Sequence, residues 1–107
     1  MRETNKEFIK ELKNYYEKQG YKCKTEFSID RENCKKLHLK GTGKIDLMCQ
    51  FGKNLKFIET EDSQRQAVMN FRDLVTASKV YRAKGFKVMA YQLIPGDDIK
   101  QTFPLKI

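Results

Sequence analysis

Apolar residues at the start of the chain first recur at helical spacing and then alternate with polar ones. Phe8 and Leu12 lie on one face of a helix expected over residues 5–19, and Gly20 supplies a stop signal. Over residues 21–29 every second side chain is apolar or small, which is typical of a strand with one buried face. The pattern therefore predicts a helix followed by a half-buried strand.

The middle of the chain predicts a β-hairpin. Residues 30–43 lose all periodicity and are rich in basic side chains, so we expect a loop there. Two strands follow over residues 44–51 and 55–61, and Gly52 at the first central position of the turn between them favours a type II′ hairpin.

A second helix and a last strand complete the pattern. Asp62 or Ser63 caps a helix that ends at Gly85, and its inner stripe is expected to consist of Ala67, Val68, Phe71, Leu74, Val75 and Ser78. Residues 86–94 are mostly apolar, as expected of a strand covered on both faces and paired in parallel with the preceding strand. Phe103 and Leu105 are candidates for an additional edge strand.

These elements predict one mixed α/β domain over residues 1–107, with the order α-β-β-β-α-β and a central mixed sheet flanked by helices. An apolar content of 39% is enough for one core in 107 residues. The chain has no apolar run long enough to span a membrane and no signal-peptide pattern, so we expect a soluble cytoplasmic protein with no membrane partner.

The net charge and the cysteines indicate which partners and which redox compartment to expect. The net charge of +8 favours a polyanionic partner such as nucleic acid or an anionic membrane surface, or else a well-solvated surface. Three cysteines without CxxC spacing argue against a disulfide framework and for a reducing compartment. The spacing of Cys23, Cys34, His38 and Cys49 is only a weak match to a zinc site.

Acidic side chains gather at one end of the predicted hairpin. With a two-residue turn, Asp46 lies opposite Glu59 and Lys44 lies opposite Glu61. Two opposed carboxylates repel each other, and a divalent cation such as Mg²⁺ or Mn²⁺ would compensate that repulsion. The alternative is a surface hairpin whose acids pair with nearby lysines and arginines.

The hairpin also carries a resemblance to a known family. A helix, a strand, the segments GKIDLM and FIETE, a second helix and an apolar strand resemble the core of the PD-(D/E)xK nuclease superfamily over about residues 5–94. That superfamily includes restriction endonucleases, archaeal Holliday-junction resolvases and RecB-type nucleases. Asp46 matches its metal-binding aspartate and Glu59 its second acid. Glu61 stands where the family has lysine, and Lys44 is the candidate for a migrated lysine.

The resemblance implies a metal-dependent endonuclease that hydrolyses phosphodiester bonds of nucleic acid, and DNA is our first expectation. Asp46 and Glu59 would hold Mg²⁺ or Mn²⁺, Glu61 would complete the metal shell or act as a base, and Lys44 would orient the attacking water. Family members often act as dimers, so a homodimer is expected as well. Backbone contacts are assigned to Arg31, Lys35, Lys36 and Lys40, and supporting roles to Glu7, Glu11, Gln64 and Gln66.

Two alternatives stay open. A nuclease fold that has lost catalysis would still bind nucleic acid or another protein, and the missing lysine favours it. A double-stranded-RNA-binding module shares the α-β-β-β-α order, but it needs a basic start to its second helix. Here that start carries Glu61 and Asp62, which repel phosphate.

Overall fold

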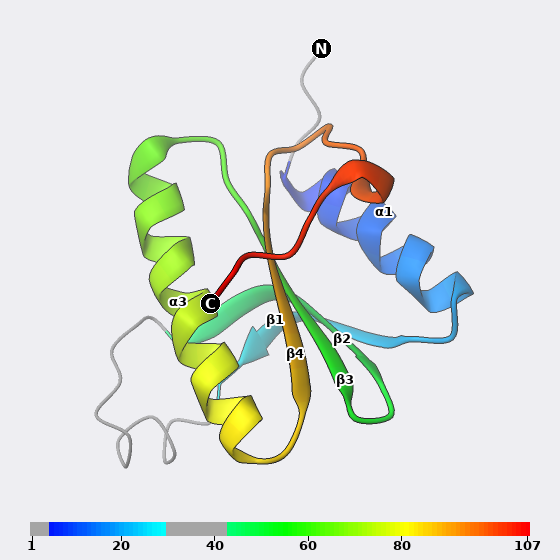
Figure 1. The fold of residues 1–107 in the computed structure, drawn as a ribbon. Coiled ribbons are helices and arrows are strands. Elements are labelled where there is room, and N and C mark those ends of the chain that lie inside the picture. Colours follow the sequence, from blue (N-terminus) through cyan, green and yellow to red (C-terminus); the bar gives the residue numbers. More distant parts are fainter. Residues whose placement is uncertain (1–4, 30–42) are drawn as a thin grey trace.

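The computed structural model describes residues 5–29 and 43–107, and it has the predicted order of helices and strands (Figure 1). The mixed α/β class is therefore confirmed. No helix in the described ranges is long and apolar enough to cross a membrane. The elements are α1 (Asn5–Lys18), β1 (Lys22–Ser28), β2 (Lys44–Phe51), β3 (Asn54–Thr60), α3 (Gln64–Ala83), β4 (Lys87–Leu93) and the 3-10 helix η1 (Ile99–Gln101).

The four strands form one mixed sheet in the order β1-β2-β3-β4, in which only the β3–β4 pair is parallel. Phe51 pairs with Asn54 and Leu47 with Ile58, so the predicted hairpin register is confirmed. Gly52 has φ +58°, the left-handed value that the first central position of a type II′ turn requires.

The sheet separates two apolar clusters, each closed by one helix. Leu74, Ala77 and Val80 of α3 pack on one cluster, which also includes Phe57 and Ala90. The second cluster is formed by Phe8, Leu12 and Tyr16 of α1 together with Leu47, Cys49, Ile58, Tyr91 and Leu93. Figure 1 shows the two helices on either side of the sheet.

The face of α3 that meets the sheet differs from the predicted one. Leu74 and Ser78 are buried as expected, but Val68 and Phe71 are 66% and 44% exposed. Polar residues lie on the sheet side of α3 in their place. The helix carries apolar residues at helical spacing on two faces, and this is why the wrong face was predicted. Periodicity shows that such a stripe exists, but it does not say which stripe lies against the sheet. The buried polar residues are Asn70, Asp73, Thr76 and Ser78.

Strand β1 changes its buried face at Glu26, so the single buried face predicted for residues 21–29 is wrong. Cys23 packs with the cluster under α1, whereas Phe27 and Ile29 pack with the cluster under α3. Glu26 has φ +49°, the left-handed region that a non-glycine residue rarely adopts. This conformation turns the strand over between Thr25 and Phe27.

Cys23 and Cys49 form a disulfide, contrary to the expectation that the cysteines are free in a reducing compartment. They are direct partners in the β1–β2 register, with Cα atoms 4.1 Å apart. Sequence spacing does not reveal this pairing because it depends on how β2 returns beside β1. The other members of the weak zinc set, Cys34 and His38, lie outside the described residues.

The C-terminal segment does not form the predicted edge strand. Leu105 donates a backbone hydrogen bond to the Ala90 carbonyl at 2.7 Å and packs on the cluster under α3. Phe103 is 86% exposed. Ile107 also packs on this cluster, and its carbonyl accepts a hydrogen bond from Arg82. These contacts hold the segment in place without a strand ladder along β4.

We predict that Glu26→Gly raises the free energy of unfolding by about 0.5–1 kcal/mol, because glycine adopts the left-handed conformation without a Cβ clash. Urea unfolding at pH 7 measures the difference. Glu26→Ala is the matched control, since it removes the carboxylate and keeps the strained backbone. Equal stabilisation by both substitutions would assign the effect to charge and contradict the prediction.

Candidate functional site

Asp46 and Glu59 meet where the ladder between β2 and β3 ends. The last ladder pair is Leu47 with Ile58, and beyond it the two acids bond to each other's strand. The Asp46 backbone N–H donates to Glu59 Oε1 at 2.6 Å, and the Thr60 N–H donates to Asp46 Oδ2 at 2.9 Å. Each carboxylate therefore replaces a carbonyl of the missing ladder, and both are held side by side.

Helix α3 supports this pair from behind through Asn70. The Asn70 side-chain amide donates to the Thr60 carbonyl at 3.0 Å, and the Thr60 hydroxyl lies 3.3 Å from Asp46 Oδ2 as a further donor. Asn70 and Thr60 are both buried. A polar residue on the sheet side of α3 thus fixes the strand segment that orients Asp46.

Burial and mutual repulsion make the pair costly to ionise. Glu59 is 3% exposed, and its pKa rises to about 8, chiefly through burial and then through the Asp46 carboxylate. Burial also raises the pKa of Asp46, against the hydrogen bonds from Thr60 that lower it. Glu26 and Asp73 add to the repulsion on Asp46. In the metal-free protein at neutral pH, the pair therefore retains a proton.

Glu26 and Asp73 belong to this acidic centre although the sequence did not single them out. The β1–β2 register places Glu26 across from Asp46, but that register follows a long connection and has no sequence signal. Asp73 lies on the face of α3 that was predicted to point outward. Asp73 was therefore not predicted as a site residue, because the wrong face of α3 was assigned to the sheet.

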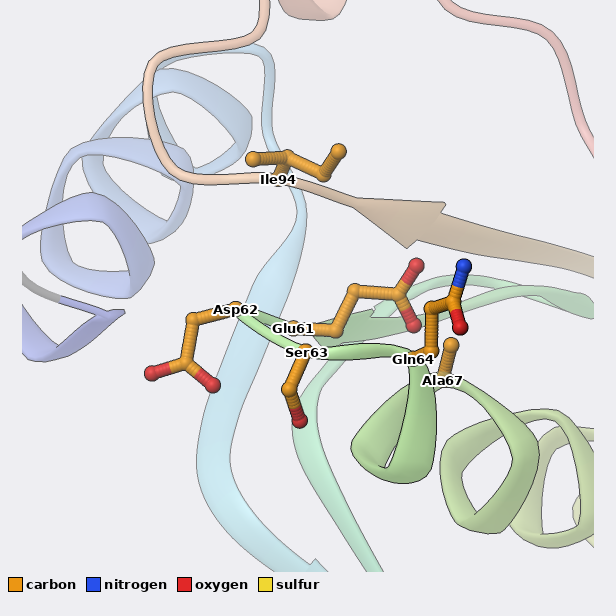
Figure 2. Close-up of a pocket in the computed structure, with 6 residues that line it drawn as sticks. All are labelled: Glu61, Asp62, Ser63, Gln64, Ala67 and Ile94. Carbon is orange, nitrogen blue, oxygen red and sulfur yellow. The ribbon is translucent and has the colours of Figure 1, made fainter.

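Glu61 lies in different surroundings from the Asp46–Glu59 pair. Gln92 of β4 donates from Nε2 to Glu61 Oε2 at 3.0 Å and to the Ala67 carbonyl at 2.6 Å. Burial raises the pKa of Glu61, and the bond from Gln92 opposes that shift. A cavity of about 240 Å³ lies here. Figure 2 shows that the Glu61 and Asp62 side chains that line it point in opposite directions. Gln92 carried no motif signal that would have identified it.

Asp46 instead lines a larger cavity of about 500 Å³ between α1 and the β1–β2 pair. Three lysines spaced four and three residues apart line it from one face of α1, namely Lys6, Lys10 and Lys13. The wall opposite them carries Glu26 and Asp46. A carboxylate centre thus opens onto a cationic surface.

The remaining predicted site residues are scattered. The β2–β3 pairing does not extend to Lys44 and Glu61, and Lys44 pairs in register with Ser28 instead. Glu7 and Glu11 are exposed on α1 and line neither cavity. Gln64 lines the smaller cavity, whereas Gln66 accepts the Asp62 N–H at 2.9 Å and serves the N-cap of α3. The predicted backbone contacts Arg31, Lys35, Lys36 and Lys40 fall in residues 30–42, outside the described ranges.

The chemistry of the pair suits a hard divalent cation. The hydrogen bonds described above are accepted by Asp46 Oδ2 and Glu59 Oε1. Carboxylate oxygens are the ligands that Mg²⁺ and Mn²⁺ prefer. No group of three or more His, Cys, Asp or Glu side chains in the described ranges is arranged to hold a metal ion. The pair therefore offers two protein ligands, and water or substrate oxygens would supply the others.

No protein-family model and no curated protein matches the chain. The case for a function accordingly depends on the geometry of Asp46 and Glu59. The resemblance of the segments that carry these two residues adds to it.

We predict that the stability of the metal-free protein falls as pH rises from 5 to 9. A carboxyl whose folded pKa lies above its unfolded value stabilises the fold fully below the unfolded pKa, 4.5 for Glu59, and loses that contribution through about pH 8. Glu59→Gln should remove most of this dependence and raise the free energy of unfolding at pH 9 by roughly 1–3 kcal/mol. Urea unfolding at both pH values, with chelator present, measures it.

The exposed Glu11→Gln substitution is the control and should leave the pH dependence as in the wild type. A wild-type protein that is equally stable at pH 5 and pH 9 would show that Glu59 holds no proton.

Proposed function

We propose that this protein is a metal-dependent nuclease that hydrolyses phosphodiester bonds of nucleic acid, with DNA as the first candidate substrate. One observation carries the proposal. Asp46 and Glu59 each accept a backbone N–H from the other's strand, so two buried carboxylates are held together beside a cavity lined by lysines. A divalent cation bound to the pair would offset the free-energy cost of ionising both carboxylates.

In this proposal Asp46 and Glu59 are the metal ligands. When bound, Mg²⁺ or Mn²⁺ would polarise the scissile phosphate and lower the pKa of an attacking water. Thr60 and Asn70 keep Asp46 in position through the bonds described above. Glu59 must give up its proton before it can ligate, so metal affinity rises with pH.

Glu61 takes an accessory role. Its carboxylate is oriented by Gln92 and faces a separate cavity. Glu61 is therefore a weaker candidate than Asp46 and Glu59 for a ligand of the metal ion. Lys44 remains the candidate for the lysine that the family has at position 61. Neither Glu61 nor Asp73 has to bind a second metal ion in this site.

Lys6, Lys10 and Lys13 would hold the phosphate backbone across the larger cavity. They lie on the same helix face and share that cavity with Asp46, so a backbone seated on them passes the carboxylate pair. Such contacts give affinity and strong salt dependence without sequence choice. They add to the basic residues that the sequence assigned within residues 30–42.

The second candidate is a nuclease fold that binds nucleic acid without cutting it. Glu61 in place of the family lysine favours it. So does the absence, within the described ranges, of a third side chain placed to hold a metal ion together with Asp46 and Glu59. The double-stranded-RNA-binding module is less favoured, because β4 pairs with β3 as a fourth strand and α3 begins beside Glu61 and Asp62.

We predict Mg²⁺- or Mn²⁺-dependent cleavage of nucleic acid that falls at least 100-fold in Asp46→Asn and in Glu59→Gln. Single-stranded, duplex and branched DNA, and a single-stranded RNA, are incubated with the protein across a series of metal concentrations. Asp62→Asn is the control, since this exposed carboxylate lies beside the site and has no proposed role as a ligand.

Titration calorimetry with Mn²⁺ separates the two candidates. Mn²⁺ binding that Asp46→Asn abolishes, without cleavage of any substrate, would assign the non-catalytic alternative. Cleavage that survives in both acid variants would exclude the assigned centre.

We predict that the triple substitution of Lys6, Lys10 and Lys13 by alanine weakens nucleic-acid binding about equally for all sequences. It should also lower the slope of log affinity against log salt concentration by about 2–3, because three phosphate contacts are lost. Fluorescence anisotropy at several salt concentrations measures the slope. The control replaces Lys18, Lys22 and Lys24, which are exposed and line neither cavity. An equal change of slope in the control would show that only total charge matters.

A further inference from the structure

Helix α3 buries several polar residues and exposes several apolar ones. Asn70, Asp73, Thr76 and Ser78 are buried, while Val68, Met69 and Phe71 are 66%, 48% and 44% exposed. Val68, Phe71 and Val75 recur at helical spacing on the side away from the sheet. We call this side, with its flanking cations Arg65, Arg72 and Lys79, the outer face of α3.

The outer face carries positive charge only. Arg65, Arg72 and Lys79 are all exposed, and the one acidic residue of α3, Asp73, is buried on the other side. An apolar stripe between cations, without a balancing acid, is unusual for a helix exposed only to water. Phenylalanine, methionine and arginine are the residue types enriched at the centres of protein interfaces.

Charge argues against two partners for the outer face of α3 that the protein itself could provide, a second copy of the chain and the segment of residues 30–42. A second copy docked by a two-fold axis along this helix would place arginines and lysines against one another. The segment of residues 30–42 carries Arg31, Lys35, Lys36 and Lys40 against two acids, so its charge does not complement the face either.

Nucleic acid and membrane fit less well than protein. Duplex phosphates match the cations but leave the apolar stripe without a partner. A membrane-surface helix immerses its apolar face and keeps its cations on the opposite side, whereas here the opposite side is buried against the sheet.

We propose that the outer face of α3 is a docking surface for an acidic, amphipathic segment of a partner protein. Apolar side chains of that segment would cover Val68 and Phe71, and its carboxylates would meet Arg65, Arg72 and Lys79. Val68 and Phe71 line neither cavity of the nuclease site, so the proposal stands apart from the proposed catalysis.

The test uses a synthetic helical peptide with leucines on one face and glutamates flanking them. Its binding is followed by fluorescence anisotropy at physiological ionic strength and mapped by NMR amide shifts. Binding in the micromolar range, with shifts along the outer face, is expected. Val68→Gln/Phe71→Gln should weaken it at least tenfold, while Met89→Gln, which replaces an exposed apolar residue on β4, should not. Thermal unfolding confirms that each variant folds.

A charge-reversal pair tests complementarity directly. Arg72→Glu/Lys79→Glu should lose the glutamate peptide and gain a peptide in which lysines replace the glutamates. Failure of the glutamate peptide to bind, or binding that the α3 variants leave unchanged, would overturn the proposal.

The competing occupants are tested with the same variants. Anionic vesicles or single-stranded oligonucleotides whose binding depends on Val68 and Phe71 would assign the face to membrane or nucleic acid and overturn the proposal. Sedimentation that shows a dimer lost in Val68→Gln/Phe71→Gln would assign it to a second copy, with the same consequence.

Discussion

The reciprocal hydrogen bonding of Asp46 and Glu59 is the constraint on which the site depends. Two adjacent antiparallel strands normally satisfy their N–H groups with each other's carbonyls, but here two side-chain carboxylates take over at the end of the ladder. The strands remain connected, and two like charges are held in a buried position. Such an arrangement is stable with a proton on the pair, or with a cation beside it.

The surrounding structure follows from this junction. The strand β1 turns over at Glu26, directly across from Asp46, and the cavity under α1 opens at that point. The sheet side of α3 must then offer polar groups, and Asn70 does so by bonding to the Thr60 carbonyl. The outer side of α3 carries apolar residues as well, and Val68 and Phe71 are exposed there.

Local patterns predicted the elements well because each depends on neighbouring residues. Ser63 accepts the Gln66 N–H as the N-cap of α3, and Gly52 occupies the turn that pairs Leu47 with Ile58. Through that turn the approach of Asp46 to Glu59 followed from counting residues. The Cys23–Cys49 disulfide and the position of Glu26 could not be predicted in this way, because both depend on how β2 returns beside β1 after a long connection.

The sequence by itself determined the order of helices and strands, the hairpin register and the proximity of two carboxylates, since turn geometry and side-chain periodicity are properties of adjacent residues. Only the tertiary structure decided which face of α3 lies on the sheet, that Gln92 holds Glu61 in a separate cavity, and that Lys6, Lys10 and Lys13 face Asp46. These relations join segments far apart in the chain. They are set by how the two helices pack on the sheet, and no local pattern encodes that packing.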